Sequence, residues 1–165
     1  MKGQFWSWCL LLLLALTSAN SCDKDPVVAG LGEEGYFVLG NFYGLCAGDD
    51  CIRIFKFYDD QLYADTKKVY PNLGSIYNGS YKKISNPHID SIGHLLSGFP
   101  KEWLSDTNDV FGCPDCVDQG GIYLELKSND IHRSWLLDNV NSALPEYLRD
   151  YAHQIQRAID LSRNR

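Results

Sequence analysis

Residues 122–137 read IYLELK, then SND, then IHRSWLL. Apolar and polar residues alternate along 122–127, and a strand-like run resumes over 131–137 after three residues that favour turns. A period of two places successive side chains on opposite faces of a strand, so one face of this segment is buried and the other is wet. The segment therefore predicts a hairpin of two antiparallel strands.

The first half of the chain is rich in aromatic and β-branched residues, which favour strands. Strands are predicted over 36–43, 51–58 and 61–64, and a short one over 80–84. Asp59 and Asp60 fall between the second and third of these strands and predict a tight hairpin turn. An antiparallel sheet is the arrangement that such short connections allow.

Two segments show the three- and four-residue apolar spacing of a helix. Asn86-Pro87 is a helix-start signal, because Asn can cap free amide groups and Pro needs no donor at the first helical position. The short helix that follows is expected to end before Gly98 and Pro100. Near the C-terminus a longer apolar stripe predicts a second, amphipathic helix. The stripe consists of Leu144, Tyr147, Leu148, Tyr151, Ala152, Ile155, Ala158 and Ile159.

The order of these elements lacks the strand–helix alternation of a parallel sheet. We predict one α+β domain over residues 35–165, with an antiparallel sheet of about five strands. A short middle helix and a long C-terminal helix pack on one face of this sheet. Residues 23–34 contain Pro26, Gly30 and Gly32 without a sustained period, and they predict a linker.

Residues 1–21 have the features of an export signal. Lys2 is basic, the apolar run over 8–16 is too short to span a bilayer, and small residues fill 17–21. At the cleavage region, the sequence Ala19-Asn20-Ser21-Cys22 resembles the lipobox of bacterial lipoproteins. An ordinary secretory signal, cut after Ala19, is the alternative interpretation.

The lipoprotein resemblance implies that Cys22 is the mature N-terminus and carries acyl chains, palmitate among them. Several acyl chains together anchor a protein stably in a lipid bilayer. Residues 22–34 would then be the lipidated tether. The resemblance also implies a place in the bacterial cell envelope, outside the cytoplasm, with the domain facing either the periplasm or the cell surface.

Four cysteines remain once Cys9 leaves with the signal and Cys22 is acylated: Cys46, Cys51, Cys113 and Cys116. An even number in an oxidising compartment predicts two disulfides. We favour the local pairs, Cys46 with Cys51 and Cys113 with Cys116, although spacing alone does not fix the connectivity. The alternative is a structural zinc site, because four thiolates could complete a tetrahedral zinc ion.

Cys113-Pro114-Asp115-Cys116 also permits thiol-disulfide exchange, since a pair spaced in this way can cycle through a disulfide. Pro after the first cysteine is similar to the active site of some glutaredoxins. Those enzymes place the motif at the start of a helix, whose dipole favours the reactive thiolate. Here the motif leads into a predicted strand, and the neighbouring Asp115 and Asp118 disfavour a thiolate.

The chain carries a formal net charge of −6, and the loss of Lys2 makes the mature chain more acidic by one unit. The sequence contains no cluster of basic residues, which argues against nucleic acid as a partner. Aromatic residues are abundant along the alternating strands, so the sheet face away from the helices could bind a glycan or a protein; filling the core is the alternative role for these rings.

No motif in the sequence identifies catalytic residues, and zinc is the one cofactor that the cysteine pattern suggests. We therefore predict a non-enzymatic, membrane-anchored lipoprotein domain that binds a ligand or supports an envelope complex. The alternatives are thiol-disulfide exchange through Cys113 and Cys116, and a structural zinc-binding domain.

Overall fold

The structure is a computed structural model that describes residues 31–72, 74–129 and 131–163. The predicted signal over 1–21, the lipidation site Cys22 and most of the 22–34 tether lie outside the described residues. Residues 31–34 of the tether form a turn closed by a hydrogen bond from the Gly35 amide to the Gly32 carbonyl at 3.1 Å. Leu31 packs against the main core, so this end of the tether is attached to the domain.

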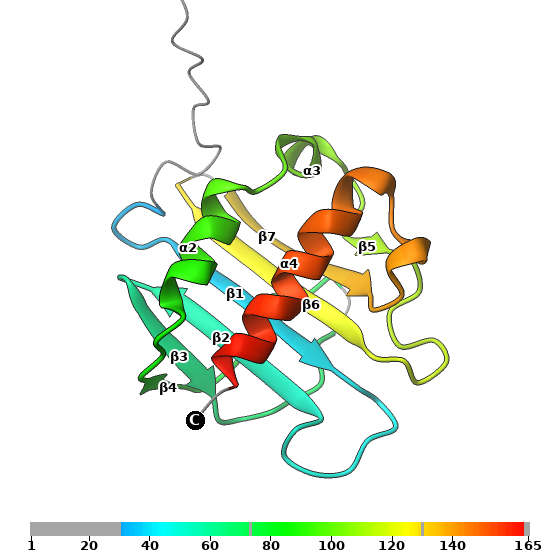
Figure 1. Cartoon of the computed structure of the whole chain (residues 1–165), viewed down its shortest axis with the longest axis horizontal. Coiled ribbons are helices and arrows are strands. Elements are labelled where there is room, and N and C mark those ends of the chain that lie inside the picture. Colours follow the sequence, from blue (N-terminus) through cyan, green and yellow to red (C-terminus); the bar gives the residue numbers. More distant parts are fainter. Residues whose placement is uncertain (1–30, 73, 130, 164–165) are drawn as a thin grey trace, which may run out of the picture.

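The described residues form a seven-stranded sheet (Figure 1). The strands are β1 (Tyr36–Phe42), β2 (Ile52–Tyr58), β3 (Gln61–Asp65), β4 (Tyr81–Ile84), β5 (Val110–Phe111), β6 (Gly121–Ser128) and β7 (Ile131–Asp138). Their order across the sheet is β4-β3-β2-β1-β6-β7-β5. Every neighbouring pair is antiparallel except β5 with β7. The predicted count of about five strands is too low: six of the seven strands coincide with predicted segments, and the seventh, β5, has two residues, which are too few to show a period.

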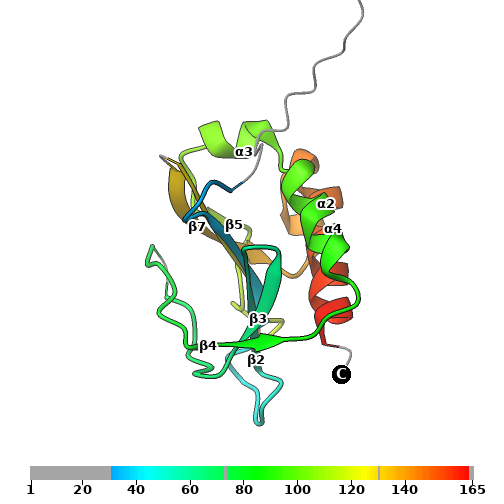
Figure 2. The same cartoon turned by 90° about the vertical axis from the view of Figure 1, so that its left-hand side faces the viewer.

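Two of the three α-helices in the described residues cover one face of the sheet, and the shortest lies across one end of the sheet, as the edge-on view in Figure 2 shows. The three helices are α2 (Ile89–Ser97), α3 (Lys101–Ser105) and α4 (Glu146–Ser162), and a 3₁₀ turn over Asn141–Ala143 precedes α4. The α+β class with a short middle helix and a long C-terminal helix is therefore confirmed. None of the helices in the described residues is long and apolar enough to cross a membrane.

The ends of the helices differ in detail from the sequence-based expectation. α2 begins at Ile89 rather than at Pro87, because the Asn86 side chain accepts the amide of His88 at 2.7 Å and closes a turn before the helix. Tyr147 lies in the predicted apolar stripe, yet it is exposed, and its hydroxyl donates to Asp106 at 2.9 Å. The remaining stripe residues are buried.

The main core lies between the helices and the sheet, and aromatic rings fill its centre. Trp103 of α3 and Trp135 of β7 are fully buried, with ring centroids 4.9 Å apart. The Phe99 ring stacks on Trp103 with ring centroids 5.2 Å apart, and the Tyr151 ring of α4 contacts the rings of Phe99 and Trp103 edge-on. Burial of such large apolar side chains contributes about 1.5–3 kcal/mol each, so this layer is the main source of stability.

A smaller core lies on the opposite face of the sheet, under the loop that joins β3 to β4 (Figure 2). Its buried residues are Val38, Phe42, Ile54, Tyr123 and Leu136. From the loop, Tyr70 packs on Phe42 with ring centroids 4.9 Å apart, and Tyr77 packs on Tyr123 at 5.6 Å. The loop thus covers part of this face, and the rest of the face is open.

Asp65 holds this loop in place from the end of β3. Its carboxylate is buried and accepts the backbone amides of Lys67, Lys68 and Ser80 at 3.2, 2.6 and 2.7 Å. The Tyr77 hydroxyl donates to the same carboxylate at 2.8 Å. Because both ends of the loop bond to one side chain, the loop is fixed over the smaller core.

Candidate functional site

Beyond the residues that the loop covers, the open face of the sheet carries two adjoining rows of side chains. Residues directly opposite each other in an antiparallel ladder share a face. The register places one row across the sheet from β4 to β7, in the order Lys83, Tyr63, Lys56, Val38, Glu125 and Ser134. The second row, beside it, contains Tyr36, Lys127 and His132.

We call the solvent-accessible side chains of these rows, together with the adjacent Tyr58, the open-face patch. Its members are Tyr36, Lys56, Tyr58, Tyr63, Lys83, Lys127 and His132. Tyrosine rings and ammonium groups therefore alternate across a surface that none of the described helices covers. The sequence contains no basic cluster, because these residues come from six different strands and meet only in the folded sheet.

Glu125 lies beneath the patch, and its side chain is almost completely buried. Its carboxylate accepts the Tyr36 hydroxyl and the Tyr123 hydroxyl, each at 2.7 Å, and His132 Nε2 lies 3.1 Å from it. Burial, with the adjacent carboxylate, raises the pKa of both tyrosines, so their hydroxyls stay protonated and donate. A buried carboxylate is stable only with such partners, so this network is built around Glu125.

Lys56 occupies the centre of the patch. Its ammonium group lies 3.7 Å from the centroid of the Tyr36 ring, and the rings of Tyr81 and Tyr58 lie at 5.5 and 5.9 Å. Desolvation by burial lowers the pKa of Lys56, although the charge of Glu125 opposes this effect. Among the described residues no hydrogen bond or ion pair reaches Lys56 Nζ, so aromatic faces replace part of its hydration.

The patch is positively charged on a protein whose net charge is −6. It contains three ammonium groups, and one buried carboxylate lies beneath them. Lys127 also has an exposed partner, since Glu34 lies 3.6 Å from it. A surface that collects cations on an acidic protein favours an anionic ligand.

The four cysteines lie in two loops at the other end of the sheet from the patch. Cys46 pairs with Cys51 between β1 and β2, and Cys113 pairs with Cys116 between β5 and β6. The Cα atoms are 5.5 Å apart in each pair, within the range of a disulfide. The structure thus supports disulfide bonds with the local connectivity, and within the described residues no three His, Cys, Asp or Glu side chains gather to hold a metal ion.

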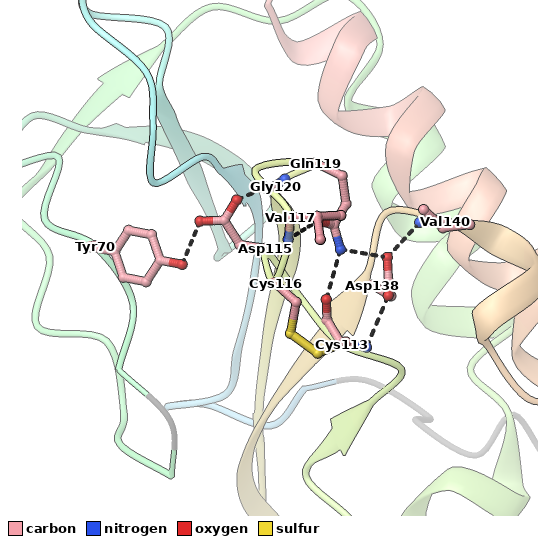
Figure 3. The surroundings of a disulfide bond; sticks show 9 residues. All are labelled: Tyr70, Cys113, Asp115, Cys116, Val117, Gln119, Gly120, Asp138 and Val140. Carbon is pink, nitrogen blue, oxygen red and sulfur yellow. Dashed lines mark hydrogen bonds between the residues drawn. A yellow bond between two sulfur atoms is a disulfide. The ribbon is translucent and has the colours of Figure 1, made fainter.

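The Cys113–Cys116 loop is hydrogen-bonded to several neighbouring segments (Figure 3). The Asp115 carboxylate accepts the Gly44 amide at 2.7 Å, the Tyr70 hydroxyl at 2.8 Å and the Gly120 amide at 2.9 Å. Burial and this hydrogen bond raise the pKa of Tyr70 to about 12. Asp115 therefore joins the disulfide loop to the β1–β2 loop and to the β3–β4 loop.

Asp138 anchors the other side of the same loop (Figure 3). Its buried carboxylate accepts the Cys113 amide at 2.9 Å and the Val140 amide at 2.8 Å. Gln119 bridges the two ends, because its side-chain amide donates to the Cys113 carbonyl at 2.7 Å and lies 3.3 Å from Asp138. The loop is a dense hydrogen-bonded unit in which each anchor is an acceptor of backbone amides.

The surroundings of Cys113 and Cys116 differ from the helix-start position that the motif occupies in glutaredoxins. Residues 113–121 are all described, and they run from a turn directly into β6 without a helix that would stabilise a thiolate. The carboxylates of Asp115 and Asp138 bond to the loop itself, so the local charge is negative. Cys113 and Cys116 are nevertheless both exposed, as exchange with a partner would require.

The sequence pattern predicts an aromatic surface on the sheet face away from the helices, but it does not identify Glu125 or the lysines as part of that surface. The alternation over 122–127 does place Glu125 on the same strand face as Tyr123 and Lys127. It does not reveal which face the helices cover, nor which residues of β1 and β2 stand opposite. That information is contained in the strand register, which depends on the whole sheet.

The chain matches no protein-family model, and no curated protein is significantly similar to it.

Proposed function

We propose that this chain is a non-enzymatic binding domain of the bacterial cell envelope, and that it contacts its ligand through the open-face patch. In this proposal the acylated Cys22 anchors the chain in a lipid bilayer. The observation that carries the proposal is the Lys56 ammonium group, which lies 3.7 Å from the centroid of the Tyr36 ring, with two more tyrosine rings at 5.5 and 5.9 Å and no acceptor among the described residues.

The arrangement around Lys56 favours a ligand role over a purely structural one. Partial burial of an unpaired ammonium destabilises its charged form, as the lowered pKa of Lys56 indicates. The tyrosine rings offset only part of the lost hydration, and an incoming acceptor would meet a preorganised and partly desolvated cation. Sites that carry function often have this kind of perturbed group.

The envelope location has separate support. The export signal and the lipobox-like sequence before Cys22 imply secretion and lipidation, and the two disulfide pairs fit an oxidising compartment. Mass spectrometry of the N-terminal peptide from the native host tests the anchor. A diacylated or triacylated Cys22 supports it, and an unmodified N-terminus after Ala19 overturns it.

The binding face is tested by ¹H–¹⁵N spectra of the purified protein titrated with neutral oligosaccharides, acidic oligosaccharides and acidic peptides. Shift changes centred on the amides of β1, β2 and β6 support the proposal. Changes centred on residues 113–120 would instead assign recognition to the disulfide loop. The absence of ligand-induced changes on the open face with all three ligand classes would overturn it.

Thiol-disulfide exchange is the second candidate, and the exposure of Cys113 and Cys116 is the observation that favours it. Insulin reduction in the presence of dithiothreitol tests this activity. Loss of an accelerated rate on Cys113→Ser, but not on Cys46→Ser, would support exchange. A wild-type rate equal to that of dithiothreitol alone would exclude it.

A further inference from the structure

We infer that the open-face patch recognises an anionic oligosaccharide, one that carries a carboxylate on successive sugar units. This inference rests on the binding function proposed above and specifies its ligand class. Three features support it: the spacing of the lysines, the position of the tyrosines, and the backbone groups of the central strands, which are already hydrogen-bonded within the sheet.

The lysines are spaced for an extended anion rather than for a single one. Lys83 is on β4, Lys56 on β2 and Lys127 on β6, so each neighbouring pair is separated by two strand spacings. Adjacent strands lie about 4.8 Å apart, which puts the lysine positions roughly 10 Å apart at the backbone. One carboxylate cannot contact all three ammonium groups, whereas a chain with charges at regular intervals can.

The tyrosines supply surfaces on which sugar rings can stack. Tyr63 lies between Lys83 and Lys56 in the first row, and Tyr58 is 37% exposed at the end of β2. Their rings combine an apolar face with a hydroxyl that can bond to a sugar hydroxyl. His132, at the other end of the patch, is exposed and is oriented by Glu125.

The backbone disfavours a peptide as the ligand at this place. β1, β2 and β6 each pair on both sides, so their amides and carbonyls are used within the sheet. A peptide that adds to a sheet by backbone hydrogen bonds needs a free edge. Recognition over these three strands must therefore use side chains, through ion pairs and ring stacking, and among the patch residues only Lys83 lies on an edge strand, β4.

Single-stranded nucleic acid shares this chemistry of charge and rings, but the rest of the molecule opposes it. Nucleic-acid sites lie in broad positive surfaces that contact many phosphates. Here the patch has three lysines and no arginine, on a protein with a net charge of −6. A sparse row of charges fits a uronate chain better than a polyphosphate.

The test uses the purified full chain and two probes of equal length: an oligogalacturonate and the same oligomer with its carboxylates methyl-esterified. The acidic oligomer is expected to bind in calorimetry at low salt and to weaken as salt is raised, because the ion pairs are at a surface. The ester is expected to bind at least about ten-fold more weakly, a difference of roughly 1.4 kcal/mol.

Matched lysine variants locate the site. Lys83→Gln is expected to weaken binding of the acidic oligomer by about two- to five-fold, as is Lys127→Gln, in line with exposed ion pairs. Lys82→Gln is the control: it removes the same charge from the same strand, but Lys82 pairs with Ala64 and faces the helix side. Lys82→Gln is expected to leave affinity unchanged.

The outcomes separate the ligand class from the binding face. Equal binding of both oligomers at the patch would overturn the anionic class and leave the binding face standing. Binding of oligo-dT or polyglutamate in place of the oligogalacturonate would overturn the glycan. An equal loss of affinity on Lys82→Gln and Lys83→Gln would remove the patch as the site. Failure of every probe to shift the open-face amides would overturn this inference and the proposed function together.

Discussion

Replacement of Glu125 by Gln tests whether the open face is organised by a buried carboxylate. Glu125 accepts two tyrosine hydroxyls at 2.7 Å, and hydrogen bonds to a charged group contribute about 1.5–3 kcal/mol each. Gln keeps the shape and one acceptor oxygen, but its NH₂ group replaces the other acceptor. The Tyr123 hydroxyl already accepts the Tyr77 amide at 2.9 Å. One strong bond is therefore lost, and we expect a destabilisation of about 2 kcal/mol.

Urea unfolding followed by tryptophan fluorescence measures this change. Trp103 and Trp135 are buried on the helix side of the sheet, so they report global unfolding rather than a change at the patch. A loss of 2 kcal/mol lowers the urea midpoint by about 1 M at an m-value near 2 kcal/mol/M. Glu33→Gln, at an exposed position, is the control and is expected to stay within about 0.5 kcal/mol of wild type.

A double-mutant cycle separates the hydrogen bond from other effects of the substitution. Tyr123→Phe removes the same bond from its other side, so the double variant with Glu125→Gln should be less destabilised than the sum of the two single variants. We expect a coupling energy of at least about 1 kcal/mol. Additive effects, or a Glu125→Gln cost below about 0.5 kcal/mol, would refute the claim that this carboxylate organises the face.

Three further predictions concern the disulfide end of the sheet. Reduction of both disulfides should lower the free energy of unfolding by about 4 kcal/mol, since each disulfide closes a short loop and contributes about 2 kcal/mol by chain entropy. Urea titration with and without reductant measures this change, and equal stability under the two conditions would contradict the prediction. Asp115→Asn should lower the free energy of unfolding by about 1–2 kcal/mol and speed hydrogen exchange at the Gly44 and Gly120 amides. Exchange protection equal to that of the wild type would show that Asp115 does not hold these two segments. The free energy of unfolding should fall as pH rises from 10 to 12, because the pKa of Tyr70 is about 12 in the folded state and 10.0 in its ordinary state. The contribution of the Tyr70 proton to stability is therefore present below pH 10 and is lost as pH rises toward 12. Tyr70→Phe should flatten this part of the pH profile of stability, and an unchanged slope would contradict the assignment.

The local patterns in the sequence predicted most of the elements because each is amphipathic by itself. The alternation over 122–127 and the stripe from Leu148 to Ile159 depend only on which side chains must be buried. The hairpin of β6 and β7 follows from these patterns almost to the residue, whereas α4 begins at Glu146 and leaves Leu144, the first residue of the predicted stripe, in the connection before the helix. Tyr147 was misplaced because it lies at the edge of the stripe, where a hydroxyl can reach Asp106 and solvent.

The elements that the sequence did not predict depend on contacts between distant residues. β5 has two residues, and it exists because Val110 and Phe111 pair in parallel with β7. The β3–β4 loop crosses the open face because Asp65 and Tyr123 bond to it from the sheet. The patch is a third case, since the register of three neighbouring strands brings Lys56 opposite Val38 and Val38 opposite Glu125.

The two faces of the sheet differ in how they are stabilised, and this difference supports the functional assignment. On the helix side, apolar area accounts for the packing, and its aromatic centre around Trp103 is closed to solvent. On the open side, a buried carboxylate and a half-buried ammonium occupy one row, an arrangement that an apolar pair would match or exceed in stability. The fold does not need Glu125 and Lys56 for its core. Their arrangement beneath an uncovered surface is what a preorganised binding site requires, because charged and oriented groups are fixed there before the ligand arrives.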